Sequence, residues 1–421
     1  MNRLGDYELK IGPRTVRPIV IGGMGVDIST SALALEAARL GAVGHISDAM
    51  IQHVSDKNYG TDFGRRKQER FEGSVRVADK TEVKFDLEEL RQAGLNHVRA
   101  AMSHKRGDGL IFINVMEKLT MGGHKETLRT RLVAALDGGI DGITLSAGLH
   151  MDSLGMITEH PRFNDALLGI IVSSARALKI FLRSAGRLRR LPDYIVVEGP
   201  LAGGHLGFGQ DWAAHDLKTI VVEVLDLLAE QSLAIPVIAA GGIFTGTDAV
   251  EMMRLGAAGV QVGTRFTVTE ECGLPDEAKQ AYFRSTEAEV LVTDVSPTGY
   301  PLRMLSTSPC LDSNVRPMCE THGYVLDDKG QCAYLDVWHR AAEDPAKQKQ
   351  AIREKICLCY HFSRYNCYTC GHYAYRLKDT SVRESDGRYR LLPAAHVFDD
   401  YLTSVDGRIK LPAGAAATPS A

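Results

Sequence analysis

The sequence predicts an α/β protein built on a TIM (β/α)8 barrel, with an insertion after the second strand and a cysteine-rich C-terminal subdomain. Two observations lead to this prediction. Between residues 17 and 266, short apolar runs alternate with amphipathic stretches, as they do in repeated βα units. The last two runs, 235–243 and 259–266, each end in a turn of small residues. In such a barrel the loops after strands 7 and 8 form a phosphate cradle, so we expect a phosphorylated ligand at the carboxyl ends of the strands.

Eight apolar runs fit the strands of the barrel. They show little polar–apolar alternation, as expected for parallel strands that are buried on both faces. The stretch 215–231 has the apolar periodicity of a helix, and Ser29 or Thr30 can cap another helix that stops at Gly41. The predicted strands are 18–21, 42–46, 110–115, 142–146, 169–173, 194–197, 236–239 and 259–262.

The rest of the chain divides into further parts. The segment 55–108 is too long for a loop between two strands. It contains a basic run at 65–67 and a helical stretch at 87–102, and we interpret it as an insertion that could cover the barrel mouth. A helix is predicted over 276–283, and cysteine-rich sequence follows it. The predicted parts are a barrel at 1–290, a cysteine-rich subdomain at 291–412 and a flexible tail at 413–421.

The amino-acid composition gives no support for a nucleic-acid or membrane partner. The 421 residues include 49 Lys and Arg against 52 Asp and Glu, which gives no electrostatic argument for binding nucleic acid or an anionic membrane. No apolar run approaches the ~20 residues that span a bilayer. The polar start at 1–6 does not resemble a signal peptide, so we expect a cytoplasmic, thiol-containing protein with a small-molecule substrate. Barrels of this size often pair, which makes a homodimer a reasonable expectation.

Polar and glycine residues follow several of the predicted strands. Gly22 and Gly23 end the first strand, where they allow the backbone to approach a flat ligand, or simply form a tight turn. Asn114 ends the third strand, where a polar side chain faces a ligand or caps a loop. Ser146 follows the fourth strand with the same reasoning and less force.

The segment after the sixth strand carries the strongest candidate for chemistry. It begins at Glu198 and continues through Ala202, Gly203 and Gly204 to His205. The small residues leave room for a planar ring, and His205 projects from what we expect to be a flexible, glycine-flanked loop. Histidine titrates near neutrality and transfers protons in many enzymes. The alternative is a loop histidine that hydrogen-bonds a backbone carbonyl.

These elements resemble, in the right order, the nitronate monooxygenase (2-nitropropane dioxygenase-like) family of FMN-dependent barrels. The resemblance spans residues 18–266, and its most specific element is the Ala-Gly-Gly-His run at 202–205. The family includes flavin-dependent enoyl-acyl-carrier-protein reductases. The chain departs from the usual family pattern at 44–48, in the insertion and in the C-terminal block.

The resemblance implies that FMN binds at the barrel top, with His205 near the reactive flavin edge as the group that takes or gives the substrate proton. Four residues would hold the phosphate: Gly241, Gly242, Gly263 and Thr264. The ring and ribityl chain would lie against Gly22, Gly23, Met24 and Asn114. The wall of the site would be completed by Glu198, Gly203 and Gly204.

Several functions fit this interpretation. The first is an FMN oxidoreductase that oxidises a nitronate or nitroalkane with O2. The second is a reductase that passes a hydride from NAD(P)H through FMN to an activated alkene; the chain has no second Gly-x-Gly-x-x-Gly unit, but NAD(P)H can bind at the open flavin face. The other two are an isomerase or lyase with a phosphorylated substrate, and a non-enzymatic scaffold.

The cysteines are concentrated in one C-terminal segment. Seven of the eight lie between Cys310 and Cys370. Four closely spaced thiols can bind Zn or an iron–sulfur cluster, although Cys-x-Cys followed by seven residues is not a common zinc pattern. Buried reduced thiols and disulfides are the alternatives. The candidate ligands are Cys357, Cys359, Cys367 and Cys370.

Overall fold

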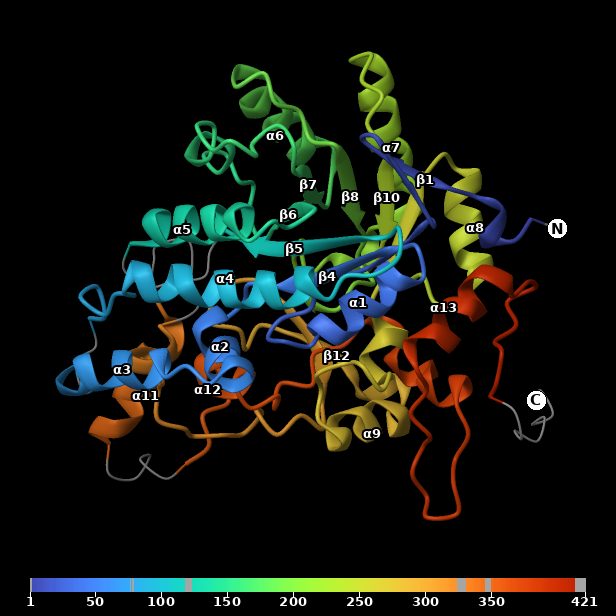
Figure 1. Ribbon diagram of the computed structural model, residues 1–421. Coiled ribbons are helices and arrows are strands. Elements are labelled where there is room, and N and C mark those ends of the chain that lie inside the picture. Colours follow the sequence, from blue (N-terminus) through green and yellow to red (C-terminus); the bar gives the residue numbers. More distant parts are fainter. Residues whose placement is uncertain are drawn as a thin grey trace.

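The computed structural model describes residues 2–75, 77, 79–117, 123–323, 331–344 and 350–412, and its centre is a closed parallel barrel (Figure 1). The strands pair in the order β10-β11-β3-β4-β5-β6-β7-β8, so that the last strand closes on the first. The eight predicted strands are confirmed, with ends that move by at most two residues. They are β3 (Ile19–Ile21), β4 (Val43–Ser47), β5 (Leu110–Met116), β6 (Gly142–Ser146), β7 (Leu167–Val172), β8 (Tyr194–Glu198), β10 (Val237–Ala240) and β11 (Gly259–Val262).

Helices surround the strands, as the apolar periodicity predicts. Thr30 caps the first of them, because its hydroxyl accepts a hydrogen bond from Leu33 N at 3.1 Å. The helix over 215–231 is confirmed as α7, which buries its apolar stripe against the barrel. The outer helices are α1 (Ser31–Arg39), α4 (Leu87–Ser103), α5 (His124–Asp137), α6 (Ala175–Arg187), α7 (Leu217–Glu230) and α8 (Gly246–Arg254).

An N-terminal hairpin closes the amino end of the barrel. Its strands are β1 (Leu9–Ile11) and β2 (Arg14–Val16), which pair antiparallel. Leu9 and Ile11 are fully buried and pack with inward-facing strand residues such as Val20 and Ile238. Because this end is plugged with apolar side chains, a ligand has to enter from the carboxyl ends of the strands.

A polar chain crosses the barrel interior and explains the unusual sequence at 44–48. The His45 ring bonds Ile21 O at 2.8 Å and the Thr144 hydroxyl at 2.6 Å, and Thr144 in turn bonds the Tyr194 hydroxyl. Burial lowers the pKa of His45 to about 4, so the ring is neutral at physiological pH. His45 is therefore a satisfied core histidine in the strand that departs from the family pattern.

The insertion after β4 contains two helices that extend beyond the barrel, α2 (Ile51–Tyr59) and α3 (Phe63–Arg70). The helix α4 at the end of the segment packs on α1 and α5, so it serves as the barrel's own crossover helix. In Figure 1 the insertion helices lie on the same side of the barrel as the C-terminal helices α11 (Ala333–Glu343) and α12 (Leu358–Phe362).

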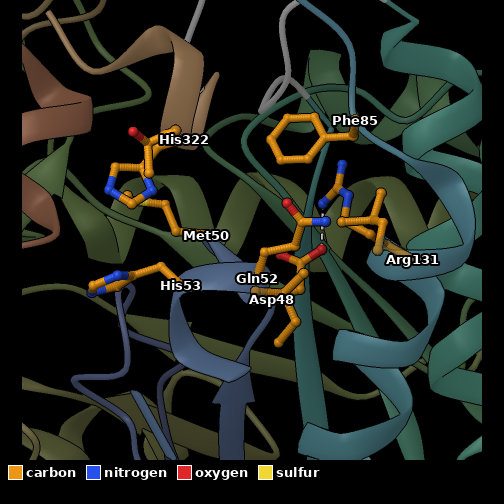
Figure 2. Close-up of a pocket in the computed structure, with 10 residues that line it drawn as sticks. Asp48, Met50, Gln52, His53, Phe85, Arg131 and His322 are labelled. Atoms are coloured by element: carbon orange, nitrogen blue, oxygen red, sulfur yellow. Dashed lines mark hydrogen bonds and ion pairs between the residues drawn. The ribbon is translucent and has the colours of Figure 1, made fainter. Parts of the chain in front are cut away.

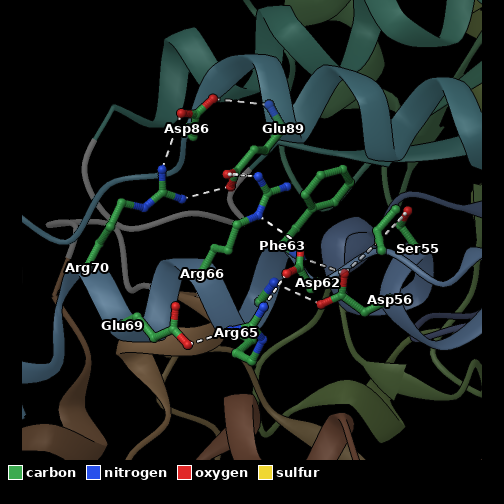
Figure 3. Close-up of polar contacts among 12 residues, drawn as sticks. Ser55, Asp56, Asp62, Phe63, Arg65, Arg66, Glu69, Arg70, Asp86 and Glu89 are labelled. Carbon is green, nitrogen blue, oxygen red and sulfur yellow. Dashed lines mark hydrogen bonds and ion pairs between the residues drawn. The ribbon is translucent and has the colours of Figure 1, made fainter.

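The three arginines of α3 pair with neighbouring acids (Figure 3). Arg65 pairs with Asp62, which directly precedes α3, and with Glu69 on its own helix. Arg70 reaches Glu89 of α4 at 2.7 Å, and Arg66 lies 3.5 Å from the same carboxylate. Each exposed pair contributes little to stability, but together they leave no net positive patch for an anionic partner among these arginines.

Two buried lysines attach the insertion to the C-terminal block. The Lys67 ammonium donates to Cys319 O at 2.9 Å and Glu320 O at 3.1 Å, and burial lowers the pKa of Lys67 to about 8. Lys80 pairs with the Glu320 carboxylate at 2.6 Å, with side-chain exposures of 1% and 4%. The insertion and the C-terminal block therefore form one layer.

The C-terminal block packs on the barrel mouth. One apolar cluster joins barrel-mouth residues such as Val26 and Ala49 to C-terminal residues such as Ile356 and Leu358. The tail 413–421 lies outside the described residues, and the domain division near residue 290 stays a prediction. Among the helices of the described ranges, none has the length and apolar character needed to cross a membrane. The other C-terminal elements are α9 (Asp276–Arg284), β12 (Val290–Thr293), β13 (Leu302–Leu305), α10 (Cys319–His322) and α13 (Ala394–Thr403).

The buried Lys80–Glu320 pair predicts a large mutational effect. Lys80→Met leaves the Glu320 carboxylate buried without its cation, which we expect to lower the free energy of unfolding by about 3–5 kcal/mol. Urea denaturation measures this change. The matched control is Lys218→Met, because Lys218 and Glu251 form an exposed pair at 2.9 Å and should lose less than about 1 kcal/mol. Equal effects of the two substitutions would contradict the prediction.

Candidate active site at the carboxyl end of the barrel

The loop after β3 and the end of β5 meet at the barrel mouth. Asn114 donates from Nδ2 to Gly23 O at 3.1 Å. A Cβ on Gly23 would overlap the Asn114 side chain, so only glycine fits this contact. Ser29 fixes the loop from behind, because its hydroxyl donates to Gly22 O at 2.7 Å and accepts from Met24 N at 2.9 Å. The structure therefore brings these predicted residues together.

Two buried acceptor oxygens point to a missing donor at this place. Asn114 Oδ1 and Gln261 Oε1 have no hydrogen-bond partner within the part of the chain that the structure describes. Gln261 lies on β11, and its side chain is in van der Waals range of a Cβ on Gly22. Buried polar atoms are almost always paired, so a ligand with a hydrogen-bond donor would complete the site. Sequence reasoning missed Gln261, although one polar residue in a short apolar strand is a signal.

The predicted phosphate cradle has the backbone geometry that glycine permits. Gly241 and Gly242 have φ values of 93° and 84°, which side chains with a Cβ rarely adopt. Gly263 and Thr264 follow the neighbouring strand β11, which pairs directly with β10. The Met24 sulfur lies 3.2 Å from the Cβ position of Gly263, so the loop after β3 reaches the cradle. All four cradle residues are thus at one edge of the mouth.

A C-terminal segment crosses directly over the cradle. His372 N donates to Leu201 O at 3.1 Å. A Cβ on Gly371 would overlap the Thr264 hydroxyl, and a Cβ on Gly203 would lie 2.6 Å from the Cys370 carbonyl carbon. The backbone at 370–372 therefore touches both the cradle and the loop after β8. Nothing in the local sequence signals this long-range contact.

The expectation of a flexible loop around His205 is wrong. The segment forms a short strand, β9 (Gly204–His205), that pairs antiparallel with β13. Arg303 of β13 is fully buried, and it donates from Nη1 to Pro200 O at 2.7 Å and also to Ala202 O. Its guanidinium stacks over the Trp212 ring at 4.5 Å. These contacts fix the loop because the C-terminal block supplies a second strand.

His205 has a side-chain partner in the same block. Its Nε2 bonds the Ser296 hydroxyl at 2.7 Å, and Ser296 bonds the Thr298 hydroxyl at 2.8 Å. The Phe362 ring lies edge-on to the imidazole, with 6.4 Å between the two ring centroids. Burial lowers the pKa of His205 to about 4, so the ring is neutral near pH 7 and can accept a proton. The Nε2 contact is thus to a serine hydroxyl and not to a backbone carbonyl.

Glu198 ends β8 beside Ala240 of β10. Burial raises the pKa of Glu198 to about 7, well above the usual value of 4.5. The carboxyl group therefore exchanges its proton in the physiological range. Perturbed pKa values of this kind cluster at functional sites, which supports the prediction that Glu198 belongs to the wall of this one.

The four candidate cysteine ligands do not converge. Cys357, Cys359 and Cys367 lie in one apolar cluster, whereas Cys370 lies in another. Within the described ranges, no group of three His, Cys, Asp or Glu side chains is placed to hold a metal ion, and the eight cysteines form no disulfide. Burial raises the pKa of Cys357 to about 12, which keeps its thiol protonated. The observations therefore favour buried thiols and give the metal or cluster no support.

Comparisons with known proteins agree with the geometry. A family model described as nitronate monooxygenase matches residues 130–354, slightly more than half of the chain. A probable nitronate monooxygenase of Staphylococcus saprophyticus is 30% identical over 192 residues, which cover 45% of this chain and 51% of that protein. A Mycobacterium tuberculosis protein named as an octahydro-indene-carboxyl-CoA dehydrogenase is 37% identical over 116 residues, 27% of this chain and 30% of that protein.

Solved structures share the fold. A nitroalkane oxidase from Streptomyces ansochromogenes superimposes with a TM-score of 0.56 at 18% identity, covering 94% of this chain and 96% of that one. FabK from Thermotoga maritima gives a TM-score of 0.53, also at 18% identity, with 91% of each chain covered. The chain spans about half the length of the Staphylococcus saprophyticus relative and less than a third of the Mycobacterium tuberculosis relative.

The raised pKa of Glu198 predicts a pH effect on stability. The folded protein holds this proton at pH values where the unfolded chain has lost it, so the stabilisation is complete below about pH 4.5 and is lost as the pH rises through about 7. Glu198→Gln should therefore be more stable than the wild type at pH 8. Denaturation midpoints at pH 5 and pH 8 measure the difference, with Glu230→Gln on the exposed end of α7 as the control. Parallel pH profiles for wild type and Glu198→Gln would argue against a buried carboxyl.

Proposed function

Because the chain belongs to the nitronate monooxygenase family, we propose that it is an FMN-dependent oxidoreductase that oxidises a nitronate or nitroalkane with O2. The observation that carries the proposal is the occurrence of three features at the carboxyl end of the barrel. These are the glycine cradle, the two unpaired acceptor oxygens and the neutral imidazole of His205.

The residues present fit FMN. The unpaired oxygens of Asn114 and Gln261 match a ring that carries an N–H donor, and the positive φ angles at 241 and 242 form a tight turn of the kind whose backbone N–H groups can bind a phosphate. When bound, FMN would accept the substrate's electrons and pass them to O2. The phosphate would be held by Gly241, Gly242, Gly263 and Thr264. The ring and ribityl chain would contact Gly22, Gly23, Met24, Asn114, Glu198, Gly203 and Gly204, to which we add Gln261.

The protein's own part in the reaction is to bind, orient and move one proton. The bond from Nε2 to Ser296 holds the His205 ring, so Nδ1 is the nitrogen that we assign to proton transfer. Because the imidazole is neutral, it can take the acidic proton from the carbon that bears the nitro group. The pairing of β9 with β13 keeps the Nδ1 atom of His205 in a fixed position at the barrel mouth. A substrate that enters as the nitronate has already lost this proton and needs only the positioning.

A second candidate is an NAD(P)H-dependent flavin reductase of the enoyl-acyl-carrier-protein reductase type. The relative whose name describes a carboxyl-CoA dehydrogenase supports a redox reaction on a substrate other than a nitronate. Anaerobic stopped-flow measurements separate the two candidates. Rapid bleaching of the flavin by NADH would support the reductase, and bleaching by a nitronate would support the oxygenase.

FMN binding tests the cofactor. We expect the purified protein to bind FMN, with absorbance near ~450 nm as flavin brings its own chromophore. Asn114→Leu removes one hydrogen-bond acceptor and should weaken FMN binding by about tenfold or more in a fluorescence titration. Asn164→Leu, at an exposed position, is the control. A protein that stays colourless with added FMN would rule out the proposal.

His205 is tested by removal of the imidazole. His205→Ala should lower turnover of a neutral nitroalkane by about 10²–10⁴-fold while FMN stays bound. The same variant should lose far less activity on the preformed nitronate, because that substrate needs no proton removal. In the wild type, the low pKa of His205 predicts that activity falls only as the pH approaches about 4. Equal losses on both substrates would show that His205 acts only in positioning.

A further inference from the structure

Two cysteines of the C-terminal block lie with their side chains in contact. The thiols of Cys310 and Cys367 are hydrogen-bonded to each other, and both residues are buried, with exposures of 0% and 3%. Both are free thiols in the structure. A disulfide requires such proximity, because cysteines whose Cα atoms are more than about 7 Å apart cannot be bridged without backbone movement. The function proposed above uses neither residue.

Backbone hydrogen bonds hold the two thiols side by side. Leu305 N donates to Tyr368 O at 3.1 Å, and Cys310 N donates to Asn366 O at 3.2 Å. Cys367 therefore lies between two residues that are each bonded to the segment that carries Cys310. The contact between the thiols is thus built into the backbone and does not depend on side-chain rotation alone.

Ser308 adds a polar contact to the pair. Its hydroxyl lies 3.1 Å from Cys310 Sγ and donates to Asn366 O at 2.6 Å. The hydrogen bond with the Cys367 thiol lowers the pKa of Cys310, whereas burial raises the pKa of Cys367 well above its usual value. Because the thiolate is the nucleophile in disulfide chemistry, Cys310 is the better nucleophile of the two.

A small hollow gives access to the pair. The hollow around Asp48 and Gln52 (Figure 2) and a second one each have room for about one water-sized molecule. The second hollow lies between Gly25 and Val26, in the loop after β3, and the segment that carries Cys367. A ligand of more than a few atoms does not fit there. Hydrogen peroxide, which has two oxygen atoms, is close to this size.

The second hollow faces the proposed flavin site. Gly25 directly follows Met24, which we assign to the flavin contact. Hydrogen peroxide is the two-electron reduction product of O2, which the proposed function consumes, so it would arise close to Cys367. That source of oxidant rests on the proposed function. The thiol pair does not, since peroxide from any source could reach it.

We propose that Cys310 and Cys367 form a modification site, in which hydrogen peroxide converts the two thiols to a disulfide. The Cys367 sulfur attacks one oxygen of the peroxide, the O–O bond breaks, and the products are a sulfenic acid and one water molecule. The Cys310 sulfur then attacks the Cys367 sulfur, and the S–O bond breaks. The hydroxide that leaves takes the remaining thiol proton and becomes the second water molecule. The thiols lose two electrons, and the peroxide gains them.

The new bond would join the two segments that hold the barrel mouth. Cys310 follows β13, which pairs with the strand that carries His205. Cys367 precedes Gly371, whose backbone lies against Thr264 of the cradle. In the reduced protein these segments are joined by hydrogen bonds, and a covalent bond would keep them together when those bonds break. Oxidation would therefore fix the C-terminal block on the mouth.

Peroxide treatment of the folded, full-length protein tests the site. Fully reduced protein is exposed to hydrogen peroxide, the remaining thiols are blocked with iodoacetamide, and disulfides are mapped by mass spectrometry. We expect a cross-link between Cys310 and Cys367 that dithiothreitol reverses. Fragment spectra are needed, because trypsin leaves Cys367 and Cys370 in one peptide. No reaction, a different pairing, oxidation to sulfinic acid, or a reaction that needs denaturant would overturn the proposal.

Single substitutions assign the sulfurs. Cys310→Ser and Cys367→Ser should each abolish the cross-link. Cys370→Ser is the matched control and should leave the cross-link unchanged, because Cys370 is similarly buried and close in sequence but lies in a different apolar cluster. Circular dichroism checks that each variant is folded, and the map of the wild type decides the question if a substitution unfolds the protein. A cross-link that survives Cys310→Ser would overturn the assignment.

Hydrogen exchange measures the effect on the C-terminal block. His372 N donates to Leu201 O at 3.1 Å, so exchange of this amide reports opening of the block above the mouth. Its exchange should slow by about tenfold or more in the oxidised wild type, and not in peroxide-treated Cys310→Ser. Unchanged exchange in the cross-linked protein would overturn the claim that the bond fixes the block. The measurement is made without FMN, so a protein that forms the cross-link but binds no FMN keeps this inference and loses the flavin proposal.

Discussion

The site depends on the hydrogen bonds that Arg303 donates to the loop after β8. A fully buried guanidinium needs compensation, and here two backbone carbonyls and the face of Trp212 supply part of it, while Arg303 Nε and Nη2 have no hydrogen-bond partner among the described residues. The same strand pairs with Gly204 and His205, so charge and strand pairing act on one short segment. A glycine-rich loop that would otherwise move is held as a fixed wall. The orientation of His205 follows from that, since Ser296 belongs to the same block.

The barrel is closed at both ends by parts of the chain outside it. The hairpin β1–β2 fills the amino end with apolar side chains, and the C-terminal block covers the carboxyl end. The insertion supports this cover through Lys67 and Lys80, whose ammonium groups are buried in the contact. The polar groups at the mouth are therefore partly desolvated, which strengthens the electrostatic interactions among them. The perturbed pKa values of Glu198 and His205 have this common cause.

Sequence reasoning could predict the features that arise from local periodicity and turn chemistry. The eight strands are buried on both faces, so each appears in the sequence as an apolar run. Thr30 caps α1, as its position before the apolar periodicity predicts. Sequence reasoning could not find Ser296 or Gly371 as neighbours of the mouth, because those contacts join distant segments, and it overlooked the signal of Gln261, a polar residue in an apolar strand. The cysteine spacing was similarly uninformative, since Cys367 and Cys370 are close in sequence and lie in different apolar clusters. The flexible-loop expectation failed for the same reason, as a strand nearly 100 residues away pairs with the loop.

The close approach of Gly371 to Thr264 has a consequence for how the protein is assembled during its lifetime. A coenzyme seated in the cradle would be sandwiched between the barrel and a segment made about 100 residues later on the ribosome. It would have to be captured before the last part of the chain docks, or wait for that part to lift. Exchange with a free pool would then be slow even if intrinsic affinity were modest, and retention would be governed by the lifetime of the docked state. The C-terminal block, which is synthesised last, would then control how fast a bound coenzyme is released.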